Sequence, residues 1–202
     1  MSYAQLNESH LEIVAYYENL SGSFKFLDGR TTGNIELLSN EELAEYHIYP
    51  VIDNKPSFDS RYQALVQGET NIIGSQVTRT WNVMEYDLSA LKEQRIREVN
   101  QARDGLINGG VVFDGKLFDS DIISRSNITA TAASIGLGEV LLEGFSWRNA
   151  NNEDVPMDVE TFRMFSMTVF GHVYAAHITA RNHKDTINAM DTAEAVAAYS
   201  ID

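Results

Sequence analysis

The sequence predicts an α+β protein, in which a small strand-rich N-terminal module is followed by a helical module with two β-hairpins. Between residues 22 and 86, apolar and polar residues alternate in short runs separated by turn residues, a pattern typical of strands. From Asp87 onward, apolar residues recur every three or four positions, a pattern typical of helices, and two short alternating stretches interrupt them. We therefore divide the 202-residue chain into an N-terminal arm (1–21), a strand-rich module (22–86) and an α+β domain (87–202).

The N-terminal arm has the least regular pattern. Leu6, Ile13 and Tyr17 fall near one face of a helix, so a short helix is predicted from Leu6 to Tyr17. As a hypothesis, this segment anchors the chain on a neighbouring subunit. The alternative is a frayed terminus, and the sequence favours neither.

The strand-rich module contains three segments with strand character. They are "SFKFLDGRTTGNIELL" with a turn at Asp28-Gly29, "YHIYPVIDNKPSF" with two prolines, and the alternating "SQVTRTWNVMEY". Between the first two, "SNEELAEY" predicts one turn of helix. Ser39 and Glu42 there have the spacing of a capping box.

The α+β domain begins with the most regular helical pattern of the chain, "DLSALKEQRIREVNQARDGLINGG". Asp87 is the expected N-cap, and Gly109-Gly110 the expected stop. The row predicted to face the core consists of Leu88, Leu91, Arg95, Val99, Ala102 and Leu106. The charged residues on the opposite face are expected to be solvated neighbours at helical spacing.

Two hairpins separate the helices that follow. In "VVFDGKLF" the turn is Asp114-Gly115, and Asp119 or Ser120 is expected to cap the next helix, "DIISRSNITATAASIG". The second hairpin is predicted from a strand ending at Trp147, a polar turn over residues 149–153 and a return at Val155.

A long helix follows the second hairpin, with Asp158 as its expected cap. Its predicted core row is Phe162, Phe165, Val169, Val173, Ala176 and Ala180, with Ile187 near the end. A last short helix is expected in "DTAEAVAAY". Asp191 and Glu194 are placed there as a capping box.

The composition limits the classes of partner. A formal net charge of −14 disfavours binding to nucleic acid or to anionic membranes, so neither is expected as a partner. The absence of cysteine excludes disulfides and thiolate metal sites. No signal peptide and no membrane-spanning apolar run is recognisable, so we expect synthesis in the cytoplasm without export by a signal peptide.

No group of residues specifies a reaction. His172, His177 and His183 are five and six residues apart and diverge around a helix, so they do not predict a metal site. The "DSD" of residues 119–121 lacks the glycine of a calcium loop and is better explained by helix capping. Nucleophile-elbow and nucleotide-binding motifs are absent. We therefore expect no catalytic residue, metal or cofactor, no enzymatic activity, and no binding residue that the sequence identifies.

Trp81 and Trp147 have two interpretations. Tryptophan stacks on sugars, but a tryptophan in an alternating strand belongs more often to the core. The core interpretation is preferred for both residues.

The order of several segments resembles a known family of domains. The segments are "LKEQRIREVNQARDGLINGG", "VVFDGKLFDSD" leading into "SRSNITATAA", "FSWRNANNEDVPMDVETF" and "HVYAAHITARNHKDTINAMDTAEAVAAY", covering about Leu88 to Tyr199. Together they resemble the uncharacterised C-terminal domain of tailed-bacteriophage tail-fibre-associated proteins, some of them labelled tail fibre assembly proteins. The upstream stretch from residue 38 to 92 looks like the module that precedes this domain in phage proteins.

The resemblance implies a place in a virion tail, and it transfers no catalytic residues. The expected function is a structural component of a bacteriophage tail, at the baseplate or tail-fibre periphery, that attaches or organises fibres through protein contacts. A tail fibre assembly chaperone is the second hypothesis, and a carbohydrate-binding host-recognition module the third. The expected partners are other phage tail proteins, fibre or baseplate subunits, and a homo-oligomer is compatible with all three hypotheses.

Overall fold

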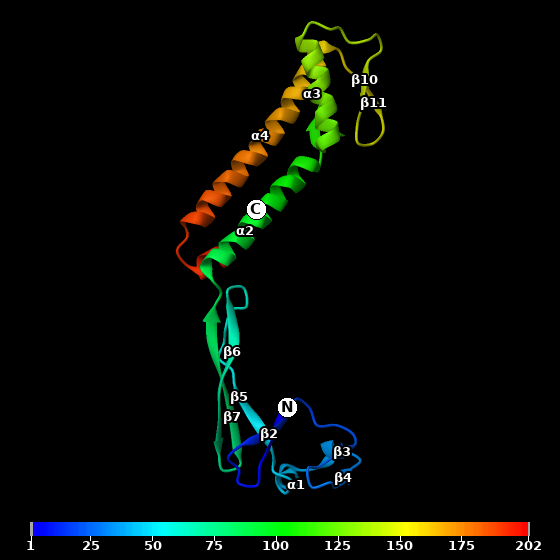
Figure 1. Ribbon diagram of the computed structural model, residues 1–202. Helices are drawn as coiled ribbons and strands as arrows, with labels where there is room; N and C mark the ends of the chain where they lie inside the picture. The colour runs from blue at the N-terminus through cyan, green and yellow to red at the C-terminus, as the bar shows by residue number, and fades with distance from the viewer. Residues whose placement is uncertain (1, 202) are drawn as a thin grey trace. The chain divides into compact units, whose positions relative to one another are not determined.

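The computed structural model describes residues 2–201 and confirms the α+β class. The chain forms two compact units, Met1–Tyr86 and Asp87–Asp202. Strands dominate the first unit and helices dominate the second (Figure 1). No helix within residues 2–201 is both long and apolar enough to cross a lipid bilayer.

The first unit is built on a five-stranded sheet with the order β2-β1-β5-β7-β6. The β5–β7 pair is parallel and the other neighbours are antiparallel. The strands are β1 (Tyr3–Leu6), β2 (Ile13–Tyr17), β5 (Ile48–Asn54), β6 (Gln63–Ile73) and β7 (Gln76–Glu85).

The helix predicted from Leu6 to Tyr17 is wrong, because this segment forms a strand end, a turn and a second strand. The Oδ1 atom of Asn7 accepts hydrogen bonds from the Ser9 hydroxyl and the Leu11 backbone N–H, which closes the turn. Burial in β2 alternates with a period of two residues. The segment predicted as an arm thus contributes β1, which lies between β2 and β5 inside the sheet.

Short elements pack around Ile48 at the beginning of β5. They are β3 (Phe24–Lys25), β4 (Thr31–Thr32), the 3-10 helix η1 (Ile35–Leu37) and α1 (Asn40–Ala44). The predicted capping box is confirmed: the Ser39 hydroxyl accepts from the Glu42 N–H, and the Glu42 carboxylate accepts from the Ser39 N–H. A small core holds these elements together: Leu20, Phe26, Ile35, Leu43 and Ile48.

No individual strand was predicted from the sequence at β6. Its pairing with β7 is interrupted by a register shift between Gln67 and Thr70, which breaks the alternation that would have revealed it. Gly68 lies in this irregular stretch, where a Cβ atom would come within 2.7 Å of the Thr80 Oγ1 atom. A glycine is therefore required for the close approach of the two strands.

The second unit contains two long helices that lie side by side, α2 (Leu88–Asn108) and α4 (Val159–Ala189) (Figure 1). A shorter helix, α3 (Ile122–Gly136), packs against α4, and the last helix, α5 (Ala193–Ala198), packs against α2. All four helices were predicted. The N-caps Asp87 and Asp158 are confirmed, since their side chains accept from the Ala90 and Thr161 N–H groups.

Both predicted hairpins are confirmed. The first pairs β8 (Val111–Phe113) with β9 (Lys116–Phe118), and the second pairs β10 (Ser146–Arg148) with β11 (Asp154–Pro156). Asp114 and Gly115 both have positive φ angles, of 47° and 74°, as the predicted two-residue turn requires.

Two predicted caps are displaced along the chain. Helix α3 is capped by Asp121 instead of Asp119 or Ser120; the Asp121 side chain accepts from the Ile123 and Ser124 N–H groups. Helix α5 is capped by Thr192 instead of Asp191, and the Thr192 hydroxyl accepts from the Ala195 N–H. Local spacing did not separate adjacent residues that can all serve as caps.

The main core of the second unit joins α3, α4 and both hairpins. Its buried residues are Val111, Phe118, Ile128, Ile135, Met157, Phe162, Phe165 and Val169. The predicted core row of α4 is therefore largely confirmed. In α2, by contrast, Leu106 is 55% exposed and Ile107 is buried in its place. The buried residues of α2 are Leu91, Val99 and Ile107, and each eight-residue step between them moves the buried position about 80° around the helix.

Candidate interaction surface

Helix α4 carries apolar side chains on its outer face as well as on its core face. Met164, Met167, Phe170 and Tyr174 each expose half or more of their surface. The rings of Phe170 and Tyr174, one turn apart, are stacked with centroids 6.1 Å from each other. Scattered apolar residues are normal on protein surfaces, but a contiguous apolar row is typical of an interaction surface.

A groove of about 370 Å³ lies between α3 and α4 beside this row. Ile128 and Val169 are its buried apolar residues, and Met167 and Phe170 line it from α4. The Arg125 guanidinium, which also lines it, donates hydrogen bonds to the Asn108 side chain and the Ser120 backbone oxygen. The groove therefore offers apolar surface beside a cation without a carboxylate partner among residues 2–201.

The segment between α3 and β10 is a second exposed apolar feature. Leu137 is 87% exposed, and Val140 and Leu142 are each 82% exposed. Leu142 and Phe145 also line a shallow hollow of about 480 Å³ next to the beginning of α4. Exposing three aliphatic side chains costs hydrophobic free energy, which a partner would recover by covering them.

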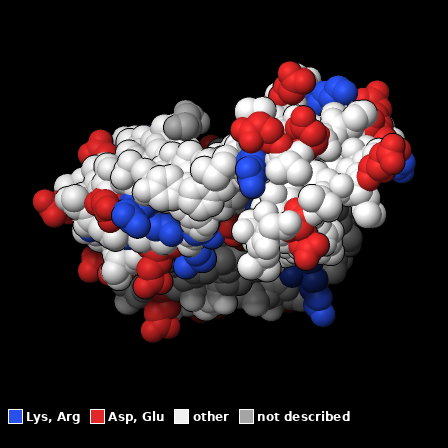
Figure 2. Space-filling view, turned by 90° about the horizontal axis from the view of Figure 1, so that it is seen from above, with Lys and Arg blue, Asp and Glu red and all other residues white. Residues whose placement is uncertain are grey.

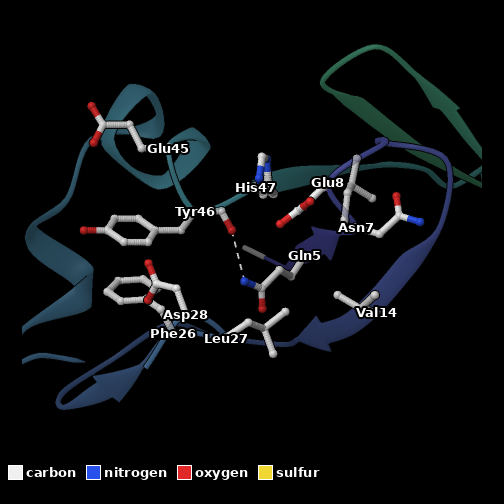
Figure 3. A pocket seen from close by; sticks show the side chains of 11 residues that line it. Gln5, Asn7, Glu8, Val14, Phe26, Leu27, Asp28, Glu45, Tyr46 and His47 are labelled. Carbon is white, nitrogen blue, oxygen red and sulfur yellow. Dashed lines mark hydrogen bonds between the residues drawn. The ribbon is translucent and has the colours of Figure 1, made fainter. Parts of the chain in front are cut away.

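The first unit contains a hollow of about 490 Å³, whose lining residues are shown in Figure 3. Its polar groups are largely engaged within the protein. The Gln5 amide donates to the Tyr46 backbone oxygen and accepts from the Tyr17 hydroxyl. The His47 Nδ1 atom lies 2.8 Å from the His10 Nε2 atom, so one of these two nitrogens donates and the other accepts.

The three histidines of α4 do not come together. The His172 Nε2 atom donates to the Leu106 backbone oxygen at 2.9 Å, and the His183 Nδ1 atom lies 2.7 Å from the Tyr199 hydroxyl. His177 is exposed. Within residues 2–201, no three histidine or carboxylate side chains form a group that could hold a metal ion.

The two tryptophans occupy different surroundings. Trp147 packs against Phe162 and Phe165 in the main core. Trp81 is half-buried on β7; its indole N–H donates to the Asp53 carboxylate, and the Lys55 ammonium lies 4.6 Å from its ring centroid. The core interpretation therefore holds for Trp147, whereas Trp81 belongs to a polar cluster on the sheet.

Acidic residues are unevenly distributed. Figure 2 shows carboxylate side chains scattered over the visible surface, with basic side chains in smaller groups among them. Helix α3 and residues 161–184 of α4 contain no Asp or Glu, although the chain has 29 acidic residues. The apolar row of α4 therefore lies in a stretch without negative charge.

Asp53 links β5 to β7 through its side chain. It accepts from the Arg79 guanidinium at 2.8 Å and from the Trp81 indole at 3.0 Å. Partial burial raises the pKa of Asp53, but the hydrogen bonds from Trp81 and Arg79 outweigh burial and bring the pKa below its usual value.

A carboxyl group whose pKa is lowered by folding stabilises the fold above its unfolded-state pKa, about 3.9, and this contribution is lost as the pH falls through the lower folded-state pKa. We expect Asp53→Asn to lower the free energy of unfolding of the first unit at neutral pH, and the difference from wild type to shrink below about pH 4. Urea unfolding over a pH series measures this. Glu69 is exposed on β6, and Glu69→Gln removes one negative charge, as Asp53→Asn does. The difference in stability between Glu69→Gln and wild type should not depend on pH in this way.

One family model matches the chain, the Domain of unknown function (DUF4376), over residues 90–201. This match covers more than half of the chain. The chain belongs to the DUF4376 family. No curated protein and no solved structure matches it.

The DUF4376 region corresponds closely to the helical unit, and it contains both exposed apolar features. Sequence reasoning did not identify either of them. In α4 the helical spacing of Met164, Met167 and Tyr174 was a usable signal. The helix then has two apolar rows, however, and the sequence alone does not show which of them faces the core. In the segment after α3, the signal was a dense apolar stretch without helical or strand periodicity.

Proposed function

We propose that the chain is a structural component of a bacteriophage tail, at the baseplate or the tail-fibre periphery, and that it attaches or organises tail fibres through protein contacts. The observation that carries the proposal is that exposed large apolar side chains form two groups on the DUF4376 region, one along α4 and one over residues 137–142. The resemblance of its segments to tail-fibre-associated proteins supplies the phage context.

A tail fibre assembly chaperone is the second candidate. The groove between α3 and α4, lined by Met167 and Phe170, favours it, because a flexible methionine beside an apolar groove suits transient binding of varied segments. A permanent subunit and a chaperone differ in whether they stay in the particle.

The carbohydrate-binding hypothesis gains no support from the two tryptophans. Sugar stacking needs an accessible ring face. Trp147 is partly buried and packs against the main core, and Lys55 lies over the ring of Trp81.

Counting the chain in purified virions tests the proposal. We expect a fixed number of copies per particle, measured by quantitative mass spectrometry against a tail-tube protein. Absence from particles, together with co-purification with fibre protein from infected-cell lysate, would replace the structural role with the chaperone role.

A further inference from the structure

The outer face of α4 has the regular spacing of a helix-pairing seam. Its residues, at alternating steps of four and three, are Glu160, Met164, Met167, Gly171, Tyr174, Ile178 and Arg181. This spacing keeps the side chains on one side of a helix. The seam lies opposite the core row that includes Phe162, Phe165 and Val169.

Gly171 has no explanation within the chain. It lies in the middle of a 31-residue helix, where glycine is the least favourable residue apart from proline. Its φ angle is not positive, and a Cβ atom there would meet nothing within 4 Å. Neither backbone conformation nor internal packing requires a glycine there, so Gly171 leaves room on the apolar outer face of α4 for a close approach from outside the chain. Phe170, 62% exposed, stands directly beside this gap.

We propose that a second copy of the chain covers this seam, with its α4 antiparallel to the first and the two-fold axis between Phe170 and Gly171. Phe170 of each copy then faces Gly171 of the other, and a large side chain fills the space left by a missing one. Such a contact is self-complementary, as a two-fold interface must be. This pairing goes beyond the proposed function and does not depend on it.

The charges of the seam fit this register. Antiparallel pairing about the same axis places Met167 opposite Tyr174 of the second copy and Glu160 opposite Arg181 of the second copy. Neither Glu160 nor Arg181 has an ion-pair partner within residues 2–201. Because of the two-fold symmetry, the Glu160–Arg181 pair would form twice in the dimer. Between them, the absence of acidic residues from 161 to 184 removes the repulsion that two copies of net charge −14 would otherwise meet at close range.

Two other arrangements of the same seam bring like charges together. A parallel pair would place Arg181 beside Arg181 of the second copy. An antiparallel pair centred between His172 and Val173 would place Glu160 opposite Asp185 of the second copy. The charge pattern therefore favours the axis between Phe170 and Gly171 over these two arrangements.

Gly171→Leu separates dimerisation from folding. Leucine is a better helix former than glycine and has open space at this position, so the melting temperature of the monomer unit should not fall. The same side chain would block Phe170 of the second copy. We expect sedimentation equilibrium of the full chain to give a dimer for wild type and a monomer for Gly171→Leu.

Gly105→Leu is the matched control. Gly105 lies in α2, is exposed and also has open space around its missing Cβ atom. This variant should remain dimeric. A monomeric wild type, or a dimer that Gly171→Leu leaves intact, would overturn the proposal.

A charge exchange tests the register. Arg181→Glu should weaken dimerisation at least tenfold because it places two carboxylates opposite each other, and adding Glu160→Arg should restore it. A double variant as weak as the single one contradicts the Glu160–Arg181 pairing.

Disulfide formation tests the orientation, since the natural chain has no cysteine. Two copies of Phe170→Cys would lie next to the two-fold axis and form a disulfide-linked dimer on mild oxidation. Two copies of Met164→Cys would lie about 20 Å apart along the helix axis and remain unlinked. Cross-linking of both variants, or of neither while the reduced Phe170→Cys chain still sediments as a dimer, rules out this antiparallel arrangement.

Discussion

Replacing Phe162 with alanine is expected to lower the free energy of unfolding of the helical unit by about 3–5 kcal/mol. Phe162 is fully buried, and its ring centroid lies 5.3 Å from that of Trp147 and 5.8 Å from that of Phe145. Trp147 lies in β10 of the second hairpin and Phe145 directly precedes this strand, so the truncation would leave a cavity where α4 meets that hairpin. Rings from separate elements cannot all move inward to fill such a space.

Denaturant unfolding followed by far-ultraviolet circular dichroism, which reports mainly on the helices, measures this loss. Phe162→Leu should cost much less because it keeps most of the volume. Leu142→Ala, at an 82% exposed position of the same unit, should change the stability very little. Equal losses for Phe162→Ala and Leu142→Ala would contradict the assigned core.

The second large effect is expected from Ser120→Ala, which should cost about 1–3 kcal/mol. Ser120 is fully buried; its hydroxyl donates to the Ile107 backbone oxygen at 2.6 Å and accepts from the Gly110 N–H at 3.0 Å. It thus satisfies two backbone groups at the end of α2 from the segment that leads into α3. Alanine would leave both groups buried without partners.

Ser126→Ala provides the comparison. The Ser126 hydroxyl also donates to a backbone oxygen, that of Ile122, but it is exposed on α3, where water can replace it. The same denaturation measurement should show no loss for Ser126→Ala. A loss as large as that of Ser120→Ala would mean that burial is not what makes the Ser120 hydroxyl important.

The helical unit could be predicted from the sequence in most details because its structure depends on local signals. The caps Asp87 and Asp158 and the turn Asp114-Gly115 each act within a few residues of themselves. The error between Ser120 and Asp121 shows the limit of this reasoning. Only the fold reveals that the Ser120 hydroxyl is used by α2, which leaves the capping of α3 to Asp121.

The sheet was predicted less well because its strands depend on distant partners. Strand β1 is held by pairing with β5, which is more than forty residues away in the sequence. The residues of a short apolar segment do not indicate which distant strand it will pair with. The candidate surface escaped prediction for a related reason. An exposed apolar residue such as Phe170 has the same sequence pattern as a buried one, and three-dimensional packing alone separates them.

The helical unit has its entry and exit at the same end. The Lys92 ammonium, near the beginning of α2, donates to the Asn188 backbone oxygen near the end of α4, and Arg95 donates to the Tyr199 backbone oxygen. A force applied between the first turn of α2 and Tyr199 would therefore break the contacts between the helices one after another. A force along the helix axes would act on many contacts at the same time. The helical unit should therefore resist force along its helix axes and yield more easily to force that separates the beginning of α2 from the end of the chain.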